Sequence, residues 1–354
     1  MLSITLKNFN LPWHQHDHYW IGVVAKEGSL SPKITQALQQ AGLSAAGNAM
    51  AVKTGQRWKA AWDAVYTNLQ QASGLNEVEV AVFPSEGDFP DAAELDRKST
   101  AAIQVIAENL WLGDALLDDR IMCYLQPVLS QKDKIFGYES FARAKGEDGK
   151  IIGGDKIMEA SRALGIEFAI DRMLQVQAIK TFVASDFNGF LFVNFSPGFI
   201  HRPAVYLEGL SETAKSFGII AKHLVLDFTK SETPRDMAHL KSVCEYARSR
   251  GYSIALDDIE SLESATKLVP EVKPDFIKID MKLARLVADA SSREVIKRIV
   301  EFAHASGGTV IAEGVETEDM FLGLKQLGVD LFQGYYFSPP VPVEVVLKRT
   351  IATG

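Results

Sequence analysis

A short apolar run that ends in two adjacent carboxylates lies at Ser253-Ile254-Ala255-Leu256-Asp257-Asp258. Its hydrophobicity is continuous rather than alternating, which is typical of a parallel strand covered on both faces. Similar runs, separated mostly by helical patterns, occur on both sides of it. Strands are expected at 122–128, 135–141, 190–195, 224–228, 276–279, 309–312 and 331–337, and helices at 156–164, 169–183, 204–217, 236–249, 293–305 and 319–327. Eight strands with interposed helices predict a TIM-type (β/α)8 barrel in an α/β protein.

The link between the first two predicted strands, 122–128 and 135–141, is too short to hold a crossover helix. We therefore expect a hairpin there, which makes one barrel strand antiparallel. Residues 1–111 differ in kind, with predicted strands at 3–6, 19–24 and 78–83 and a helix face marked by Trp58, Trp62, Val65, Tyr66 and Leu69. They are expected to form a small α/β domain, joined by a helix at 99–110 to a barrel domain at 112–354. The role of the small domain, regulatory or other, stays open.

Composition limits the class of protein. The 354 residues are 47 % hydrophobic and 23 % charged, as in a globular protein with a large core. The net charge of −8 argues against binding of long nucleic acid. No apolar run reaches the ~18 residues of a membrane span, and the first residues lack a signal-peptide stretch. We expect a cytoplasmic protein without a membrane span, in which Cys123 and Cys244 are reduced core thiols.

Polar side chains stand where the predicted barrel strands end. They are Glu139, Asn194, Asp227, Asp257, Asp258, Lys278, Glu313 and Gln333. Because strand ends meet at one face of an α/β barrel, these side chains are predicted to form a single pocket. Carboxylates with a lysine favour divalent metal ions and a phosphate substrate. Turn chemistry for Asn194, and helix capping by one of the two adjacent aspartates, remain open alternatives.

Several longer motifs surround these residues. They are Leu125-Gln126-Pro127-Val128, Glu139-Ser140-Phe141 with Arg143 after it, Val193-Asn194-Phe195-Ser196-Pro197, Lys278-Ile279-Asp280, Ala312-Glu313-Gly314-Val315-Glu316-Thr317 and Gln333-Gly334-Tyr335-Tyr336-Phe337. Through them, residues from about 120 to 345 resemble the EAL family of cyclic di-GMP phosphodiesterases. The matched segments disfavour a barrel lyase of the enolase kind, which also combines carboxylates, metal and lysine.

The resemblance implies hydrolysis of cyclic di-GMP to linear pGpG by two-metal-assisted attack of water. Two Mg²⁺ or Mn²⁺ ions would be held by Glu139, Asn194, Asp227, Asp257 and Asp258. Glu313 and Lys278 would assist the attacking water. The implied substrate contacts are Gln126, Arg143, Glu316, Gln333 and Phe337. A homodimer or a regulatory protein partner is left open.

The sequence departs from the family pattern around the paired aspartates. Asp227 stands where the family has glutamate, and Lys230 where it has a second glutamate. In the loop at 257–266, Glu260 and Leu262 replace two glycines of the family pattern. Without glycine, positive φ is not expected at these two positions, so the loop is expected to differ in shape from that of the family. An ion pair between Lys230 and Glu260 or Glu263 would order such a loop, with lysine in the place of the family's second glutamate. These departures keep a second interpretation open, a catalytically inactive cyclic di-GMP receptor or protein-interaction scaffold.

One N-terminal tract carries alternating histidines. His14, His16 and His18 would share one face of a strand, as metal ligands do. An exposed polar strand face or loop is the other interpretation.

Overall fold

The computed structural model describes residues 16–55, 57–84, 87–90, 95–196, 200, 203–229 and 237–347, without the side chains of Val205 and Thr229. The chain forms two compact units. Of the described residues, those at 122–143 and from 168 onwards belong to one unit, and those up to 121 together with 144–167 belong to the other. Among the described residues, no helix combines the length and hydrophobicity that a membrane crossing needs.

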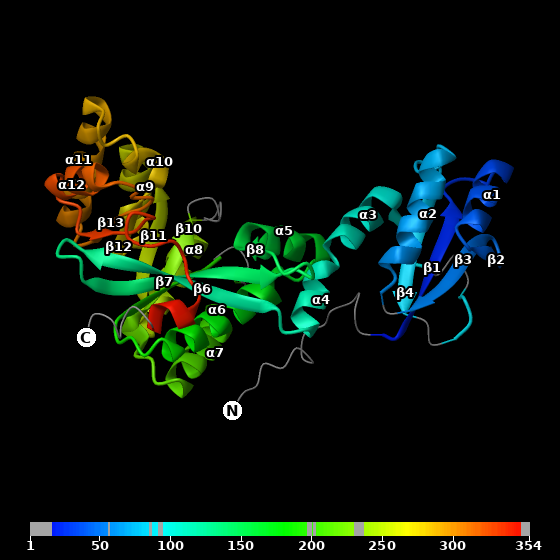
Figure 1. Ribbon diagram of the computed structural model, residues 1–354, viewed down its shortest axis with the longest axis horizontal. Helices are drawn as coiled ribbons and strands as arrows, with labels where there is room; N and C mark the ends of the chain where they lie inside the picture. The colour runs from blue at the N-terminus through cyan, green and yellow to red at the C-terminus, as the bar shows by residue number, and fades with distance from the viewer. Residues whose placement is uncertain are drawn as a thin grey trace. The chain divides into compact units, whose positions relative to one another are not determined.

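The first unit is a closed barrel of eight strands (Figure 1). They are β6 (Ile121–Ser130), β7 (Ile135–Lys145), β9 (Phe190–Asn194), β10 (Leu224–Thr229), β11 (Ser253–Ile259), β12 (Phe276–Ile279), β13 (Thr309–Ala312) and β14 (Leu331–Phe332). From β7 through β14 each neighbour is parallel, whereas β6 is antiparallel to β14 and closes the barrel by pairing with β7. The predicted barrel with one antiparallel strand is confirmed.

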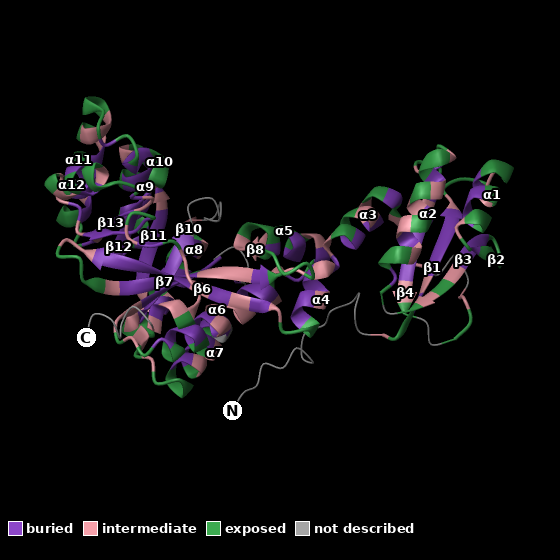
Figure 2. Cartoon of the chain, in the orientation of Figure 1, coloured by how far each residue is buried: buried purple, intermediate pink, exposed green. Residues whose placement is uncertain are grey.

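Helices follow most of the parallel strands. They are α6 (Glu167–Ala184), α7 (Pro203–Ser216), α8 (Met237–Ser249), α9 (Leu262–Val272), α10 (Met281–Ala284), α11 (Ala290–Ala305) and α12 (Glu318–Gln326). The sequence did not predict α9 or the single turn of α10. The hydroxyl of Ser261 accepts the Ser264 N–H at 3.2 Å, which caps the first turn of α9. Figure 2 shows the barrel strands as largely buried and the outer faces of these helices as exposed.

Two aspartates tie neighbouring strands together at the amino ends of the barrel. Asp275, just before β12, accepts the Ile254 N–H at 2.8 Å. Asp330, just before β14, accepts the Val310 N–H at 2.8 Å and pairs with His304. Because ligands of such barrels bind at the opposite, carboxyl end of the strands, these contacts are expected to stabilise the fold rather than the chemistry.

The second unit contains a five-stranded antiparallel sheet in the order β2-β3-β1-β4-β5. Its elements are β1 (His18–Ala25), α1 (Pro32–Gln40), β2 (Ser44–Ala46), β3 (Ala49–Gly55), α2 (Lys59–Gln71), β4 (Val78–Pro84), β5 (Lys98–Ser99) and α3 (Thr100–Asn109), followed by α4 (Trp111–Leu117), β8 (Ile151–Gly153) and α5 (Gly154–Leu164). The order βαββαβ with β1 between β3 and β4 is that of a split βαβ fold. The small α/β region is confirmed, and Trp62, Val65 and Leu69 are the buried face of α2.

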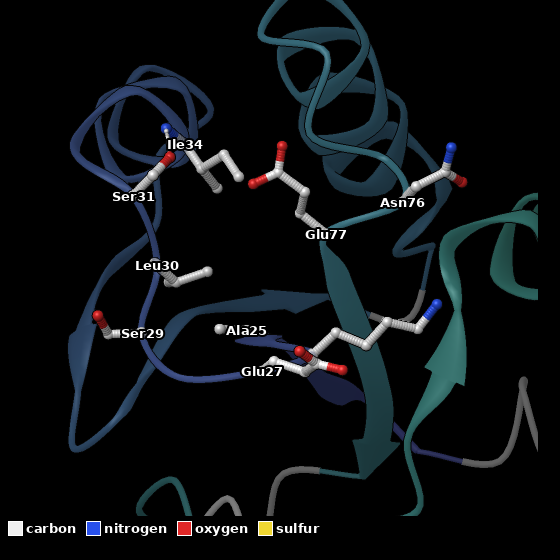
Figure 3. Close-up of a pocket in the computed structure, with 9 residues that line it drawn as sticks. Ala25, Glu27, Ser29, Leu30, Ser31, Ile34, Asn76 and Glu77 are labelled. Atoms are coloured by element: carbon white, nitrogen blue, oxygen red, sulfur yellow. Dashed lines mark hydrogen bonds between the residues drawn. The ribbon is translucent and has the colours of Figure 1, made fainter.

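Two of the features predicted near the N-terminus cannot be located. The predicted strand at 3–6 and His14 lie outside the described residues. His18 opens β1 with an exposed side chain. A pocket of about 340 Å³ lies between the β1–α1 loop and the residues before β4, with Lys26, Glu27 and Glu77 in its wall (Figure 3). No motif in the sequence indicates this pocket.

Candidate active site

The alternation of side chains along the parallel strands explains why the polar residues converge. On each of six strands, one residue points into the barrel interior, and the polar residue lies two positions later on the same side. These pairs are Phe192 and Asn194, Val225 and Asp227, Ala255 and Asp257, Phe276 and Lys278, Ile311 and Glu313, and Leu331 and Gln333. The first member of each pair fills the barrel, so the second lies at its carboxyl end.

A β-bulge brings both adjacent aspartates to this face. The register of β11 with β12 passes from Leu256 opposite Ile277 to Ile259 opposite Ile279, which leaves one extra residue on β11. Asp258 has φ +58°, a left-handed conformation that aspartate tolerates better than most residues. Asp257, Asp258 and Glu313 each offer a carboxylate oxygen, and these oxygens lie within 4.8 Å of one another. In a regular strand the two aspartates would point in opposite directions.

The loop after the aspartates runs directly into α9. Among the described residues 257–266, only Asp258 has a positive φ, so Glu260 and Leu262 adopt conformations that need no glycine. Lys230 lies outside the described residues, so its proposed pairing with Glu260 or Glu263 is not located.

Lys278 lies at the centre of the acidic cluster and is fully buried. Its Nζ is 2.7 Å from Glu313, 2.8 Å from Asp227, 3.1 Å from Glu139 and 3.6 Å from Asp257. Burial alone would lower the pKa of Lys278, but these carboxylates raise it well above its usual value. Four carboxylates contact this ammonium, and Asp258 offers a fifth beside Asp257 and Glu313. Counting only these described groups, the cluster carries an excess of four negative charges when all five carboxylates are ionised.

The pKa values of three of these carboxyls are raised by burial first and by the neighbouring carboxylates second. Burial, followed by repulsion from Asp257 and Glu139, raises the pKa of Asp227 well above its usual value although Lys278 opposes the shift. Burial and Asp257 likewise raise the pKa of Glu313 well above its usual value and that of Asp258 to about 6. The buried Oδ1 of Asp227 has no hydrogen-bond partner among the described residues. An oxygen-rich site with unbalanced negative charge and a free buried oxygen fits divalent metal ions.

Two glutamines support Glu139 from the strands that close the barrel. The Gln333 amide donates to Glu139 at 2.8 Å and to Gln126 Oε1 at 3.0 Å. The Gln126 amide in turn donates to the Ser338 carbonyl at 3.0 Å. Both glutamines are buried, so in this structure they hold Glu139 in place.

The remaining predicted site residues make their described contacts outside this cluster. Asn194 is exposed at the end of β9, and its amide lies 3.5 Å from the Ser140 carbonyl. The Arg143 guanidinium lies over the rings of Tyr124 and Phe141. Glu316 pairs with Arg285 at the surface, and the partly buried Phe337 ring packs against Phe321 and Tyr336.

Sequence inspection missed a set of polar residues close to Asn194. Asp171 and Gln175 on α6 and Tyr206 on α7 are buried and hydrogen-bonded to one another. The only signal in the sequence was the presence of polar residues on the inward face of a predicted helix.

Comparisons with known proteins match the barrel. A model of the EAL domain family matches residues 110–340. The chain is 27 % identical over 258 residues to the probable cyclic di-GMP phosphodiesterase PdeI of Escherichia coli K12, covering 68 % of this chain and 32 % of PdeI. It is 26 % identical over 236 residues to the cyclic di-GMP phosphodiesterase PdeL of the same organism, covering 64 % of each. These matches span between about a third and two thirds of the relatives' own length.

A solved structure shows the same architecture. It is a standalone versatile EAL protein from Vibrio cholerae O395 in its c-di-GMP bound form. Its sequence is 28 % identical, its TM-score is 0.55, and the match covers 63 % of this chain and 93 % of that one. Because the family model matches well over half of the residues, and does so across the barrel, this chain belongs to the EAL domain family.

Proposed function

We propose that the barrel is a cytoplasmic, metal-dependent phosphodiesterase that hydrolyses cyclic di-GMP to linear pGpG. The observation that carries the proposal is the convergence of five carboxylates around Lys278 at the carboxyl end of the barrel. The names of PdeI and PdeL and the ligand of the Vibrio cholerae structure support the choice of substrate. The buried free thiols of Cys123 and Cys244 support a reducing compartment.

Two Mg²⁺ or Mn²⁺ ions fit the acidic cluster. Glu139, Asn194, Asp227 and Asp257 would hold one ion, and Asp257 with Asp258 the other. Such ions, when bound, lower the pKa of water and balance the charge that develops on the phosphate. Asp227 is shorter than glutamate by one methylene, but its free Oδ1 leaves a ligand atom available.

The protein's own groups would orient the water and the phosphate. Glu313 is half-buried with a raised pKa, which suits it to accept a proton from the attacking water. Lys278 stays protonated and places a positive charge beside the reacting phosphate. We assign phosphate contact to Arg143 and further substrate contacts to Gln126, Gln333, Glu316 and Phe337. Gln333, held by Gln126, also keeps Glu139 oriented.

The division of the chain belongs to the same proposal. We assign residues 1–111 to a small domain with a regulatory role and residues 112–354 to the barrel domain. A homodimer or a protein partner would transmit such regulation.

The test is a pair of assays on the full chain. Turnover of cyclic di-GMP is measured with Mg²⁺ or Mn²⁺, and binding of cyclic di-GMP is measured with Ca²⁺, for the wild type and for Glu139→Gln. The proposal predicts turnover that Glu139→Gln abolishes. Tight binding without turnover would identify a receptor instead, and the absence of both would leave a protein-interaction scaffold.

A further inference from the structure

A cluster of buried polar side chains lies between two helices on the outer side of β9. Asp171 and Gln175 come from α6, and Tyr206 comes from α7. The Tyr206 hydroxyl donates to the Asp171 carboxylate and lies 3.0 Å from Gln175 Oε1. The Gln175 amide donates to Asp171 at 3.0 Å. Burial and the negative charge of Asp171 raise the pKa of Tyr206 well above its usual value, so the hydroxyl keeps its proton.

The Gln175 amide also reaches the main chain of the candidate site. It donates to the carbonyl oxygen of Asn194 at 3.4 Å. Asn194 is the last residue of β9, and the next residue, Phe195, packs edge-on against the Tyr206 ring with 5.5 Å between ring centroids. The cluster therefore contacts the carboxyl end of β9 at two points, through a hydrogen bond to Asn194 and through a ring contact with Phe195.

The ring contacts continue to the neighbouring strand. Phe195 meets Phe228 at 5.0 Å between centroids, and Phe228 directly follows Asp227. The Phe195 N–H also donates to the Asp227 carbonyl at 2.9 Å. Since alternate residues of a strand point to opposite faces, anchoring Phe195 and Phe228 among the helices fixes the direction in which Asn194 and Asp227 face the site.

We propose that Tyr206 is a positioning residue for Asn194, acting through Gln175 and Phe195. The inference rests on the proposed function because it takes Asn194 as a metal ligand. Groups behind a ligand fix its orientation, and their loss typically lowers metal affinity or activity by roughly 10–100-fold. The connection here runs through the main chain, so we expect the lower end, about ten-fold.

Two variants and one matched control test the role. Tyr206→Phe removes the hydroxyl and keeps the ring against Phe195, and Gln175→Met removes the amide and keeps the side-chain length. The control is Tyr252→Phe, since Tyr252 is also buried and its hydroxyl donates to a main-chain carbonyl of α7, that of Leu207, at 3.4 Å. Mn²⁺ affinity and Tm are measured for each full-length protein.

We expect both Tyr206→Phe and Gln175→Met to bind Mn²⁺ about ten-fold more weakly, whereas Tyr252→Phe lowers Tm without changing Mn²⁺ affinity. Wild-type Mn²⁺ affinity in Tyr206→Phe, or an equal loss in Tyr252→Phe, would overturn the positioning role.

Amide hydrogen exchange of the metal-free proteins separates this inference from the proposed function. Tyr206→Phe should speed exchange at residues 191–195, and Tyr252→Phe should not. If the wild type takes up no Mn²⁺, the proposed function fails and the exchange result decides the inference alone. Faster exchange confined to Tyr206→Phe supports the anchor, and unchanged exchange refutes it.

Discussion

Replacing Lys278 by methionine should make the stability of the barrel strongly pH-dependent. The substitution keeps most of the side-chain length but removes the only ammonium within 3.6 Å of Glu139, Asp227, Asp257 and Glu313 among the described residues. Removing one partner of a buried ion pair typically costs about 3–5 kcal/mol, because the remaining charge is left uncompensated. We expect a loss of unfolding free energy of this size, about 3–5 kcal/mol, at pH 8.

The sign of the pH dependence follows from the carboxylates. Asp227 and Glu313 already have raised pKa values in the folded protein, and loss of Lys278 removes the group that lowers them. A carboxyl whose folded pKa exceeds its unfolded pKa destabilises the fold increasingly as the pH rises above the unfolded value. The variant should therefore approach wild-type stability near pH 5 and diverge from it towards pH 8. Mn²⁺ should restore part of the difference, because it replaces the lost positive charge.

Urea unfolding at several pH values between 5 and 8, with and without Mn²⁺, measures this effect. Lys282→Met serves as the matched control, since Lys282 is an exposed lysine on α10. Equal pH profiles for Lys278→Met and Lys282→Met would refute the assignment of Lys278 as the counter-ion of the cluster.

Three further changes probe the site and its support. Because the pKa of Asp258 is raised to about 6, Mn²⁺ binding should tighten as the pH rises through 6 and this carboxylate loses its proton. Isothermal titration should show that Asp258→Asn binds Mn²⁺ more weakly and no longer shows this increase in affinity. Gln333→Leu removes one of the two described side-chain donors to Glu139 and leaves only Lys278, so urea unfolding should show a loss of about 1–3 kcal/mol. Mn²⁺ affinity should fall with it, and wild-type Mn²⁺ affinity would contradict this role. Asp330→Ala removes the acceptor of the Val310 N–H at the opposite end of the barrel, so it should cost about 1–3 kcal/mol of stability while Mn²⁺ affinity stays unchanged.

Much of the barrel could be predicted because its strands carry a strong local signal. Each buried parallel strand is an uninterrupted apolar run, and the polar residue at its carboxyl end marks where the interior-facing positions meet the surface. The period of two along these strands is enough to predict that Asn194, Asp227, Asp257, Lys278 and Glu313 share one face of the barrel.

The helix α9, the turn at Asp258 and the pairing of Gln126 with Gln333 could not be predicted from local sequence patterns. The helix α9 was missed because it contains Pro270 and begins among small polar residues, Ser261 and Ser264, which also suit a loop. The left-handed turn at Asp258 has no local sequence signal, although it decides where that carboxylate points. Gln126 and Gln333 are 207 positions apart and meet only because the barrel closes.

Anomalous diffraction from crystals of the protein soaked in Mn²⁺ tests most directly whether the acidic cluster holds metal. We expect anomalous density among Asp257, Asp258 and Glu313, with metal–oxygen distances of about 2.1 Å, as for Mg²⁺, and with oxygens of Glu139 and Asp227 turned towards metal. A map without anomalous density there, in which Lys278 keeps all four of its carboxylate contacts, would contradict this expectation.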